Sequence, residues 1–486
     1  MDTCNSNTYI ILLFHLCCLS SLIFKFGIST TPSNSKILCI PSEREALLRV
    51  KHHLIDPSNR LASWNVSNTD CCDWSGVVCS DLTGHIQELH LNTSPPPESY
   101  FDDNFVYDDF FYGGNDVHVA YNSSMFRGEI SPSLIDLKHL NHLDLSGNDF
   151  EPVQIPSFIF EMTTLSYLNL SSTGFYGEIP FQIGNLSNLL YLDLSYGAIG
   201  VIPYQIGNLT NLRHLGLKGY QNSLYAENLS WFSSLSHLQY LSLEEANLSK
   251  SFDWLQTLED LPSLTELRLS RCVIDQNHQS IVNFSSLVTL KLSIISSGQY
   301  SFVPRWIFAL RKLVSLQFSI IEDDFPMFYG IRNLSLLDGI QNLTFLENLD
   351  LSSIPLSSSM PHWLYGLRQL KFLNLQSTSL CGTISNDIGN LSSLLELDLS
   401  SNNLEGMIPS SLGNLTSLVT LDFRLNQLEG KIPTSLGNLN SLVSLDLSQN
   451  QLEEKIPTSL GNLNSLVSLH LSQNQLEGKI PTSMEI

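Results

Sequence analysis

Charged side chains, and basic ones above all, are scarce in this sequence of 486 residues. Charged residues make up 15% of the chain, whereas about 25% is usual in soluble domains. Only 24 lysines and arginines face 47 aspartates and glutamates, so the formal net charge is −23. Because binding to nucleic acid needs a basic surface that neutralises phosphates, we expect no nucleic-acid partner.

Long apolar segments are absent after the N-terminus. One apolar run extends from Ile10 to Phe24 and is followed by small residues. This pattern predicts a secretory signal peptide at residues 1–29. Asp2 stands where a basic residue is usual, so an uncleaved signal anchor is the alternative. No later segment approaches the roughly 20 apolar residues that span a bilayer, and we expect no membrane anchor further along the chain as given.

Catalytic and phosphate-binding motifs are also missing. The sequence has no His-Glu-x-x-His, no Gly-rich loop followed by lysine, and neither His-Arg-Asp nor Asp-Phe-Gly of protein kinases. Paired carboxylates, or a serine with histidine and aspartate at usable spacing, are not found either. We therefore predict that the protein is not an enzyme and takes no cofactor.

Four of the nine cysteines crowd into a window of 41 residues, at Cys39, Cys71, Cys72 and Cys79. In an exported protein this spacing indicates a local disulfide framework. Zinc binding is the alternative, but the sulfurs of the adjacent pair Cys71 and Cys72 do not easily reach one tetrahedral metal ion. We therefore predict disulfides and no metal site.

A period of 24 residues runs through the C-terminal half of the chain. The leucines that show it are Leu346, Leu370, Leu394, Leu418, Leu442 and Leu466, and a second set lies three residues on. The unit is L-x-x-L-x-L-x-x-N-x-L-x-G-x-I-P-x-x-L-G-N-L-x-x, which is identified as a plant-type leucine-rich repeat. Its L-x-L segment predicts a short strand that buries both leucines, and stacked repeats supply the core.

The same pattern extends backwards and predicts about fifteen L-x-L strands within residues 86–486. Their first leucines are at positions 89, 143, 168, 192, 215, 241, 267, 290, 316, 349, 373, 397, 421, 445 and 469. The predicted fold is an α/β leucine-rich-repeat solenoid, curved and right-handed, with parallel strands on its concave face and short 3-10 or irregular segments on its convex side. An insertion at 95–121, rich in acidic and aromatic residues, is predicted to be a loop.

An asparagine five residues after the first leucine is expected to hydrogen-bond backbone groups of the turn. The position holds asparagine in some repeats and other residues in most middle ones; the asparagines are Asn148, Asn402, Asn426, Asn450 and Asn474. Cys272 takes this position in one middle repeat, where we predict a buried, structural cysteine. Cys381 has no such place and is predicted to be a free thiol.

Residues 36–80 precede the repeats as an N-terminal module. The segment from Ser42 to Leu54 has the apolar spacing of a helix, with Ser42 as its cap and Glu45 completing a capping box. We expect this helix to cover the first repeat.

The string Cys71-Cys-Asp-Trp-Ser-Gly-Val-Val-Cys79 resembles the N-terminal cap of plant leucine-rich-repeat receptors and of secreted polygalacturonase inhibitors. The resemblance covers essentially all of the chain from residue 36 onward. It implies a disulfide between Cys39 and Cys71 and another between Cys72 and Cys79.

The resemblance also implies a function. The chain is similar to the ectodomain of a plant receptor-like protein that lacks a kinase and acts in defence or development. Such a protein recognises an extracellular peptide, protein or glycan with its concave surface and signals through a co-receptor or adaptor receptor kinase. It lies in the secretory pathway and at the extracellular face of the plasma membrane, or in the apoplast when it has no anchor.

Two alternatives stay open. One is a secreted inhibitor of pathogen cell-wall hydrolases, although such inhibitors have about ten repeats and a C-terminal cap of their own. The other is a truncated decoy or non-functional paralogue, because family receptors continue into a C-terminal cap and a transmembrane helix, whereas this chain ends at Ile486 within a repeat.

A ligand is expected to contact side chains that leave the concave strands toward solvent. Aromatic and charged residues gather there from the second to the eighth predicted strand, and tyrosine and arginine are favoured anchors at binding surfaces. The candidate residues are Tyr167, Tyr191, His214, Lys218, Tyr240, Glu244, Glu266, Arg268 and Lys291, and His142, Glu245 and Arg271 lie in the same or neighbouring columns. The alternative is that they are ordinary solvated surface residues.

Asn-x-Ser/Thr sequons are abundant, and glycans would compensate for the sparse charge. We predict glycosylation at Asn65, Asn92, Asn122, Asn185, Asn208, Asn228, Asn247, Asn283, Asn333, Asn342, Asn390 and Asn414. A thirteenth sequon at Asn169 is expected to stay bare because it lies within a predicted strand. The alternative is that Asn-Leu-Ser/Thr is merely the consensus of the repeat.

Overall fold

The structure is a computed structural model that describes residues 38–94, 121–150, 154–251, 253–274, 284–296, 304–322, 337–354, 356 and 358–481. The chain divides into two units, Met1–Leu38 and Cys39–Ile486, and the described helices and strands all lie in the second. Among the described residues, no helix has the length and apolar character needed to cross a membrane. The predicted signal peptide and nearly all of the predicted loop at 95–121 lie outside the described residues and stay predictions.

Helix α2 (Pro41–His53) opens the N-terminal module. Pro41 lies in its first turn, where a missing N–H leaves no hydrogen bond unmade. The predicted capping box is wrong, because the helix begins before Ser42 and its N-cap, Ile40, makes no side-chain hydrogen bond. Glu43 instead ties the helix to the first repeat, since its carboxylate accepts a hydrogen bond of 2.8 Å from the backbone N–H of Ile86.

The rest of this module is closed by two disulfides. It contains strand β1 (Leu54–Ile55), the short helix η1 (Cys71–Asp73) and strand β2 (Val77–Cys79). Disulfides join Cys39 to Cys71 and Cys72 to Cys79, as the family resemblance implied. The buried indoles of Trp64 and Trp74 stack with centroids 5.6 Å apart and belong to the same apolar core as Leu89 of the first repeat.

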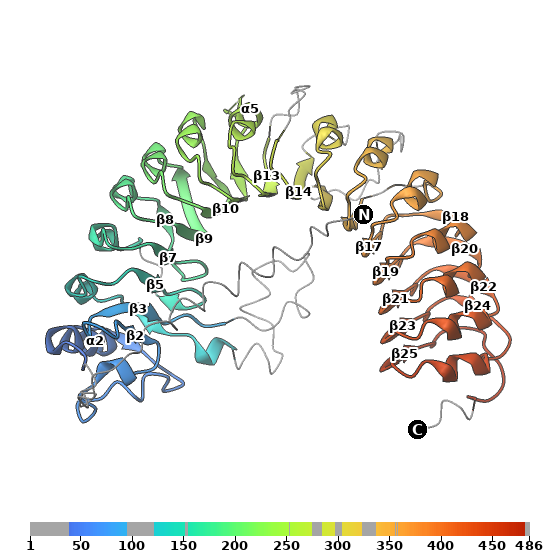
Figure 1. Cartoon of the computed structure of the whole chain (residues 1–486), viewed down its shortest axis with the longest axis horizontal. Helices are drawn as coiled ribbons and strands as arrows, with labels where there is room; N and C mark the ends of the chain where they lie inside the picture. Colours follow the sequence, from blue (N-terminus) through green and yellow to red (C-terminus); the bar gives the residue numbers. More distant parts are fainter. Residues whose placement is uncertain are drawn as a thin grey trace, which may run out of the picture. The chain divides into compact units, whose positions relative to one another are not determined.

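All fifteen predicted L-x-L segments form strands of one parallel sheet (Figure 1). Equivalent leucines lie in register, for example Leu89 with Leu143 and Leu445 with Leu469. β2 pairs antiparallel with the first strand. The strands are β3 (Ile86–His90), β5 (His142–Asp144), β7 (Tyr167–Asn169), β9 (Tyr191–Val201), β10 (His214–Tyr225), β11 (Tyr240–Glu244), β13 (Glu266–Cys272), β14 (Thr289–Ser296), β15 (Ser315–Glu322), β16 (Asn348–Asp350), β17 (Phe372–Asn374), β19 (Glu396–Asp398), β21 (Thr420–Asp422), β23 (Ser444–Asp446) and β25 (Ser468–His470).

Short helices form the opposite side of most repeats, so these turns have a strand side and a helix side (Figure 1). Their apolar residues point inward; Ile183 and Leu436 are fully buried. The short helix α5 (Trp254–Glu259) precedes β13. The 3-10 helices are η3 (Pro132–Asp136), η4 (Ser157–Glu161), η5 (Phe181–Asn185), η6 (Tyr204–Asn208), η7 (Ser230–Ser234), η8 (Arg305–Ala309), η10 (Asp338–Asn342), η11 (His362–Gly366), η12 (Asn386–Asn390), η13 (Ser410–Asn414), η14 (Thr434–Asn438) and η15 (Thr458–Asn462).

A second set of short strands lies at or beyond the asparagine position of the repeats, and the leucine pattern did not predict it. In the last repeats these strands form a separate parallel sheet in the order β18-β20-β22-β24. The set comprises β4 (Arg127–Gly128), β6 (Asp149–Phe150), β8 (Gly177–Glu178), β12 (Ala246–Asn247), β18 (Cys381–Thr383), β20 (Asn403–Met407), β22 (Gln427–Gly430) and β24 (Gln451–Leu452).

Where the repeat has an asparagine, its side chain joins neighbouring turns by hydrogen bonds. The side-chain nitrogen of Asn450 donates to the carbonyls of Phe423 at 2.8 Å and Leu447 at 3.2 Å. Its oxygen accepts from the N–H of Leu428 at 3.0 Å. Asn148, Asn402, Asn426 and Asn474 make equivalent contacts. These bonds satisfy buried backbone groups that would otherwise cost about 1–3 kcal/mol each.

The middle repeats satisfy the same backbone groups in other ways. Cys272 is 2% exposed, and its thiol donates to the carbonyl of Leu243 at 3.1 Å, which confirms its predicted structural place. The hydroxyl of Thr173 donates a hydrogen bond of 2.7 Å to the carbonyl of Leu170. At the position of Gly197 the backbone pairing itself continues, so β9 reaches 11 residues. Cys381 is an exposed free cysteine, as predicted.

Candidate functional site

The strand side of the repeats presents three columns of side chains to solvent. They lie before the first leucine, between the two leucines and after the second leucine, as Tyr191, Asp193 and Ser195 do in β9. In β9 the leucines Leu192 and Leu194 are buried, whereas Tyr191 and Asp193, which alternate with them, are partly exposed. Successive parallel strands lie about 4.8 Å apart. Residues at equivalent positions are therefore close enough to touch along the solenoid.

Five rings of the column before the first leucine, together with His90 of β3, form a continuous stack of six rings, called here the ring stack. Its centroid distances are 4.4 Å for His90–His142, 3.9 Å for His142–Tyr167, 4.2 Å for Tyr167–Tyr191, and 4.0 Å for both Tyr191–His214 and His214–Tyr240. From His142 to Tyr240 adjacent planes differ by at most 13°. The inner rings cover each other's faces, so their edges, with hydroxyls and imidazole nitrogens, remain for an external partner.

Burial in the ring stack favours the neutral forms of its five members from His142 to Tyr240. Burial between two tyrosine rings lowers the pKa of His214 to about 4. Burial also lowers the pKa of His142 and raises the pKa of Tyr167, Tyr191 and Tyr240. His214 and the three tyrosines therefore offer uncharged hydrogen-bonding groups at neutral pH.

Arg268 closes the ring stack at its C-terminal end. Its guanidinium lies 5.4 Å from the ring centroid of Tyr240 and pairs with Glu266 at 2.7 Å. Stacking on an aromatic face while pairing with a carboxylate is a geometry that arginine, unlike lysine, supports well. Lys291 lies in register with Arg268 on the next strand, so the basic character continues there.

A charged cluster of Lys218, Glu244, Glu245 and Arg271 lies beside the ring stack. The Lys218 ammonium is 3.4 Å from Glu244 and 3.7 Å from Glu245, and Arg271 is 3.9 Å from Glu245. The ammonium also lies 4.0 Å from the ring centroid of Tyr196. Burial disfavours the charge on Lys218, but Tyr196 and the two glutamates outweigh it, so the pKa of Lys218 is raised.

The structure thus brings the nine predicted residues together on one stretch of the strand side. Five of them are joined by ring contacts, Lys218 pairs with Glu244, and Glu266 pairs with Arg268. His90 and Tyr196 are members that the sequence did not reveal. His90 lies two residues beyond the register partner of His142, and Tyr196 turns toward Lys218 through a positive φ of 72°.

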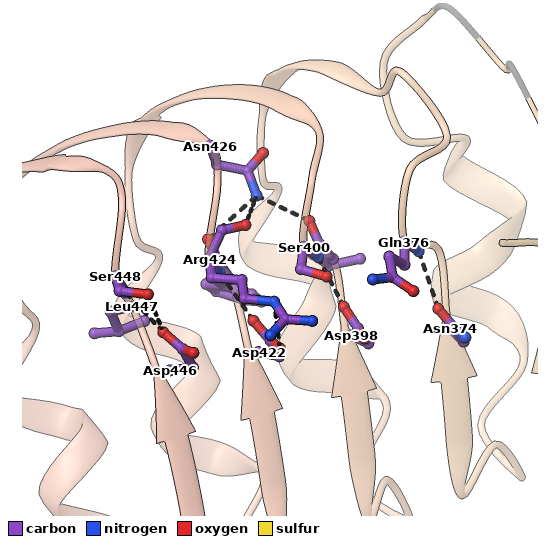
Figure 2. Close-up of polar contacts among 12 residues, drawn as sticks. Asn374, Gln376, Asp398, Ser400, Asp422, Arg424, Asn426, Asp446, Leu447 and Ser448 are labelled. Atoms are coloured by element: carbon purple, nitrogen blue, oxygen red, sulfur yellow. Dashed lines mark hydrogen bonds and ion pairs between the residues drawn. The ribbon is translucent and has the colours of Figure 1, made fainter. Parts of the chain in front are cut away.

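In the last repeats the column between the two leucines carries the carboxylates of Asp398, Asp422 and Asp446 (Figure 2). Asp398, Asp422 and Asp446 each accept a hydrogen bond of 2.8–2.9 Å from the backbone N–H two residues on. Burial, with repulsion from Asp398 and Asp446, raises the pKa of Asp422 to about 6. These carboxylates are committed to local turns. The column that holds the ring stack in earlier repeats holds Glu396, Thr420, Ser444 and Ser468 here.

The sequons are spread mainly over the helix side. Asn185, Asn208, Asn342, Asn390 and Asn414 each end a 3-10 helix and are exposed, and Asn228 is exposed as well. Asn65 differs because its amide nitrogen already donates to the carbonyls of Ala62 and Ser63. Asn92, Asn122 and Asn247 are partly buried. Asn169 lies in β7, as predicted, and Asn283 and Asn333 lie outside the described residues.

Three family models match the chain. The leucine-rich repeat N-terminal domain matches residues 40–80, the leucine-rich repeat region matches 123–325, and the single leucine-rich repeat matches 393–415, 417–439, 441–463 and 465–485. Together they follow the N-terminal module and most of the strand ladder.

Curated relatives are plant receptor-like proteins. Receptor-like protein EIX2 and receptor-like protein EIX1 of Solanum lycopersicum are 39% and 36% identical over 159 and 179 residues. The alignments cover 32% and 36% of this chain but only 13% and 15% of the relatives. The chain therefore matches a small part of each relative's length.

A solved structure has the same fold. The plant peptide hormone receptor RGFR1 in complex with RGF2 is 27% identical in sequence, with a TM-score of 0.53. The match covers 85% of this chain and 62% of that chain. With the family models and the curated relatives, this likeness shows that the chain belongs to the plant leucine-rich-repeat receptor-like proteins.

Proposed function

We propose that this chain recognises an extracellular ligand through the ring stack and the charged cluster, without catalysing a reaction. The observation that carries the proposal is the unbroken contact from His90 to Arg268 on adjacent parallel strands. Because every ring is held by its neighbours, little side-chain entropy is lost when a ligand binds. Tyrosine and arginine anchors of this kind carry much of the affinity at protein interfaces.

The ligand that fits this surface best is a peptide or protein segment rather than a glycan. A sugar packs its C–H face on an open aromatic face, and the inner rings of the stack have none. Their edges, the Lys218 ammonium and the neighbouring carboxylates suit the backbone and polar side chains of a polypeptide. The solved relative RGFR1, a peptide hormone receptor in complex with RGF2, is consistent with this class.

The remaining parts of the proposal come from the family. The relatives named receptor-like proteins support a place on the extracellular side of the plasma membrane or in the apoplast. Signalling would then need a co-receptor or adaptor receptor kinase, in defence or development. We also propose that the exposed sequons at Asn185, Asn208, Asn228, Asn342, Asn390 and Asn414 carry N-glycans.

Site-specific photocrosslinking tests this function. Benzoylphenylalanine replaces Tyr191 or Tyr240 in the secreted chain, and Tyr176, which is 47% exposed and has no member of the ring stack among its ring contacts, serves as the matched position. The probe is the peptide fraction of plant extracellular fluid, with and without microbial challenge. We expect peptide adducts at Tyr191 and Tyr240 but not at Tyr176. Equal labelling at all three positions would contradict a binding site on the ring stack.

A further inference from the structure

The most exposed phenylalanine and tyrosine rings of the described residues lie on the helix side of the repeats. They are Tyr204 at 69% exposed, and Phe181 and Phe345 at 62% each. The next ring, Tyr176, is 47% exposed. Covering such rings would remove apolar surface from water, which is favourable.

Each of these three rings lies beside a sequon. Phe181 begins η5, which ends at Asn185, and Tyr204 begins η6, which ends at Asn208. Phe345 follows Asn342, the last residue of η10, by three positions. The rings thus stand either four residues before a sequon asparagine or three residues after it.

Other repeats of the same chain lack the rings at these positions. The sequon at Asn390 has Asn386 before it and Ser393 after it, and the sequon at Asn414 has Ser410 and Ser417. In η14 and η15 the sequon itself is lost, and small polar residues stand at both positions; these are Thr434, Ser441, Thr458 and Ser465. Among the helices that end in Gly-Asn, an aromatic residue at the first position therefore occurs only in η5 and η6, and both carry a sequon.

The distances suit contact between each ring and a sugar. A 3-10 helix rises about 2 Å per residue, so in η5 and η6 four residues separate ring and asparagine by about 8 Å along the helix. An N-linked sugar and a phenylalanine or tyrosine side chain together span that gap. Phe345 instead lies in the turn that follows η10, three residues after Asn342. Unlike the rings of the ring stack, Phe181, Tyr204 and Phe345 are mostly open to solvent, and the C–H face of a sugar packs well on an aromatic face.

We propose that the N-glycans at Asn185, Asn208 and Asn342 lie back along the helix side, with their first sugars covering Phe181, Tyr204 and Phe345. The inference rests on the glycosylation proposed above and not on ligand binding. Covering the rings removes exposed apolar surface from a chain that has few charges. It also holds these three glycans near their helices, away from the ring stack.

Hydroxyl-radical footprinting of the secreted, glycosylated full chain tests the proposal. Sequons are removed one at a time by Ser187→Ala, Thr210→Ala or Thr344→Ala, which leave the asparagines in place. We expect oxidation of Phe181, Tyr204 and Phe345 to rise several-fold in the matching variant only. Ser392→Ala and Thr416→Ala remove the sequons of Asn390 and Asn414, and we expect them to leave the three rings unchanged.

Occupancy of each site is measured by glycopeptide mass spectrometry, and the oxidation of Tyr176 reports whether each variant keeps its fold. Oxidation of the three rings that stays constant when an occupied sequon is lost overturns the proposal. Absence of glycan at Asn185, Asn208 and Asn342 also overturns it. Neither result affects photocrosslinking at the ring stack, so the failure of this inference and of the proposed function are distinguishable.

Discussion

The imidazole of His214 lies flat against the ring of Tyr240, with centroids 4.0 Å apart and planes 5° apart. Tyr191 covers its other face, also at 4.0 Å. His214 therefore joins two tyrosines that belong to strands on either side of its own. A parallel sheet with one strand per repeat is what places rings from three separate repeats in direct contact.

Substitution of His214 tests how much the ring stack contributes to the fold. Aromatic pairs contribute about 0.5–1.5 kcal/mol each beyond their buried area. His214→Ala removes two pairs, so we expect the free energy of opening in β9–β11 to fall by about 1–3 kcal/mol. His214→Phe keeps both ring contacts and is the matched control. Native-state hydrogen exchange of these strands measures the effect. Equal exchange in both variants would show that the stacked rings do not stabilise these strands.

His214 also makes stability depend on pH. Its pKa in the folded protein is about 4, below the ordinary 6.5, because burial disfavours the imidazolium. Between these values the unfolded chain binds a proton that the folded chain does not, so stability rises with pH. The stabilising contribution is fully present above about pH 6.5 and is lost as the pH falls through about 4.

Thermal melts from pH 7 to pH 4 measure this dependence. Nearby Glu266 favours the charged imidazole and Arg268 opposes it, so both residues are kept. We expect the wild-type melting temperature to fall more steeply than that of His214→Phe over this range. Parallel curves for the two proteins would mean that His214 titrates normally.

Asn426 illustrates the asparagine contacts in the last repeats. Its nitrogen donates to the carbonyls of Leu399 at 2.9 Å and Phe423 at 3.2 Å, and its oxygen accepts from the N–H of Leu404 at 3.0 Å. Asn426→Ala leaves these buried groups without partners, and we expect a loss of about 3 kcal/mol. Gln427→Ala changes an exposed neighbour and is the control. Hydrogen exchange across β19–β23 is the measurement, and similar exchange in both variants would argue against the role given to Asn426.

The sequence predicted the strand ladder well because leucine spacing records the repeat directly. It did not predict strand length in β9 and β10, which reach 11 and 12 residues. There the asparagine position holds Gly197 and Tyr220, and backbone pairing replaces the missing side-chain contacts. Whether backbone pairing replaces the side-chain contacts depends on how neighbouring turns pack, and the spacing of the leucines alone does not encode this packing.

The candidate site was predicted as a column of residues but not as stacked rings. Strand alternation places Tyr191, His214 and Tyr240 in one column, whereas the angle of each ring depends on packing against its neighbours. His90 was missed because the register of β3 places Glu88 in that column. The prediction of a capping box at Ser42 was wrong because the helix already begins at Pro41, one residue before Ser42.

The two free cysteines among the described residues are expected to differ in reactivity. Burial raises the pKa of Cys272 to about 12, which keeps it a thiol at pH 8, whereas Cys381 is exposed. The thiolate is the reactive form, so iodoacetamide should alkylate Cys381 in the folded protein and reach Cys272 only after denaturation. Peptide mapping by mass spectrometry distinguishes the sites. Labelling of Cys272 at the rate of Cys381 in the folded chain would contradict its buried place.

The most direct test of the proposed binding face is the affinity of the secreted chain for the peptide that photocrosslinks to the ring stack. Isothermal titration compares wild type, Tyr191→Ala, Tyr240→Ala and the control Tyr176→Ala. Truncation of an anchoring tyrosine commonly costs about 2 kcal/mol, or more than tenfold in affinity. We predict that loss for Tyr191→Ala and Tyr240→Ala and none for Tyr176→Ala. Unchanged affinity in both ring-stack variants would contradict the claim that this face binds the ligand.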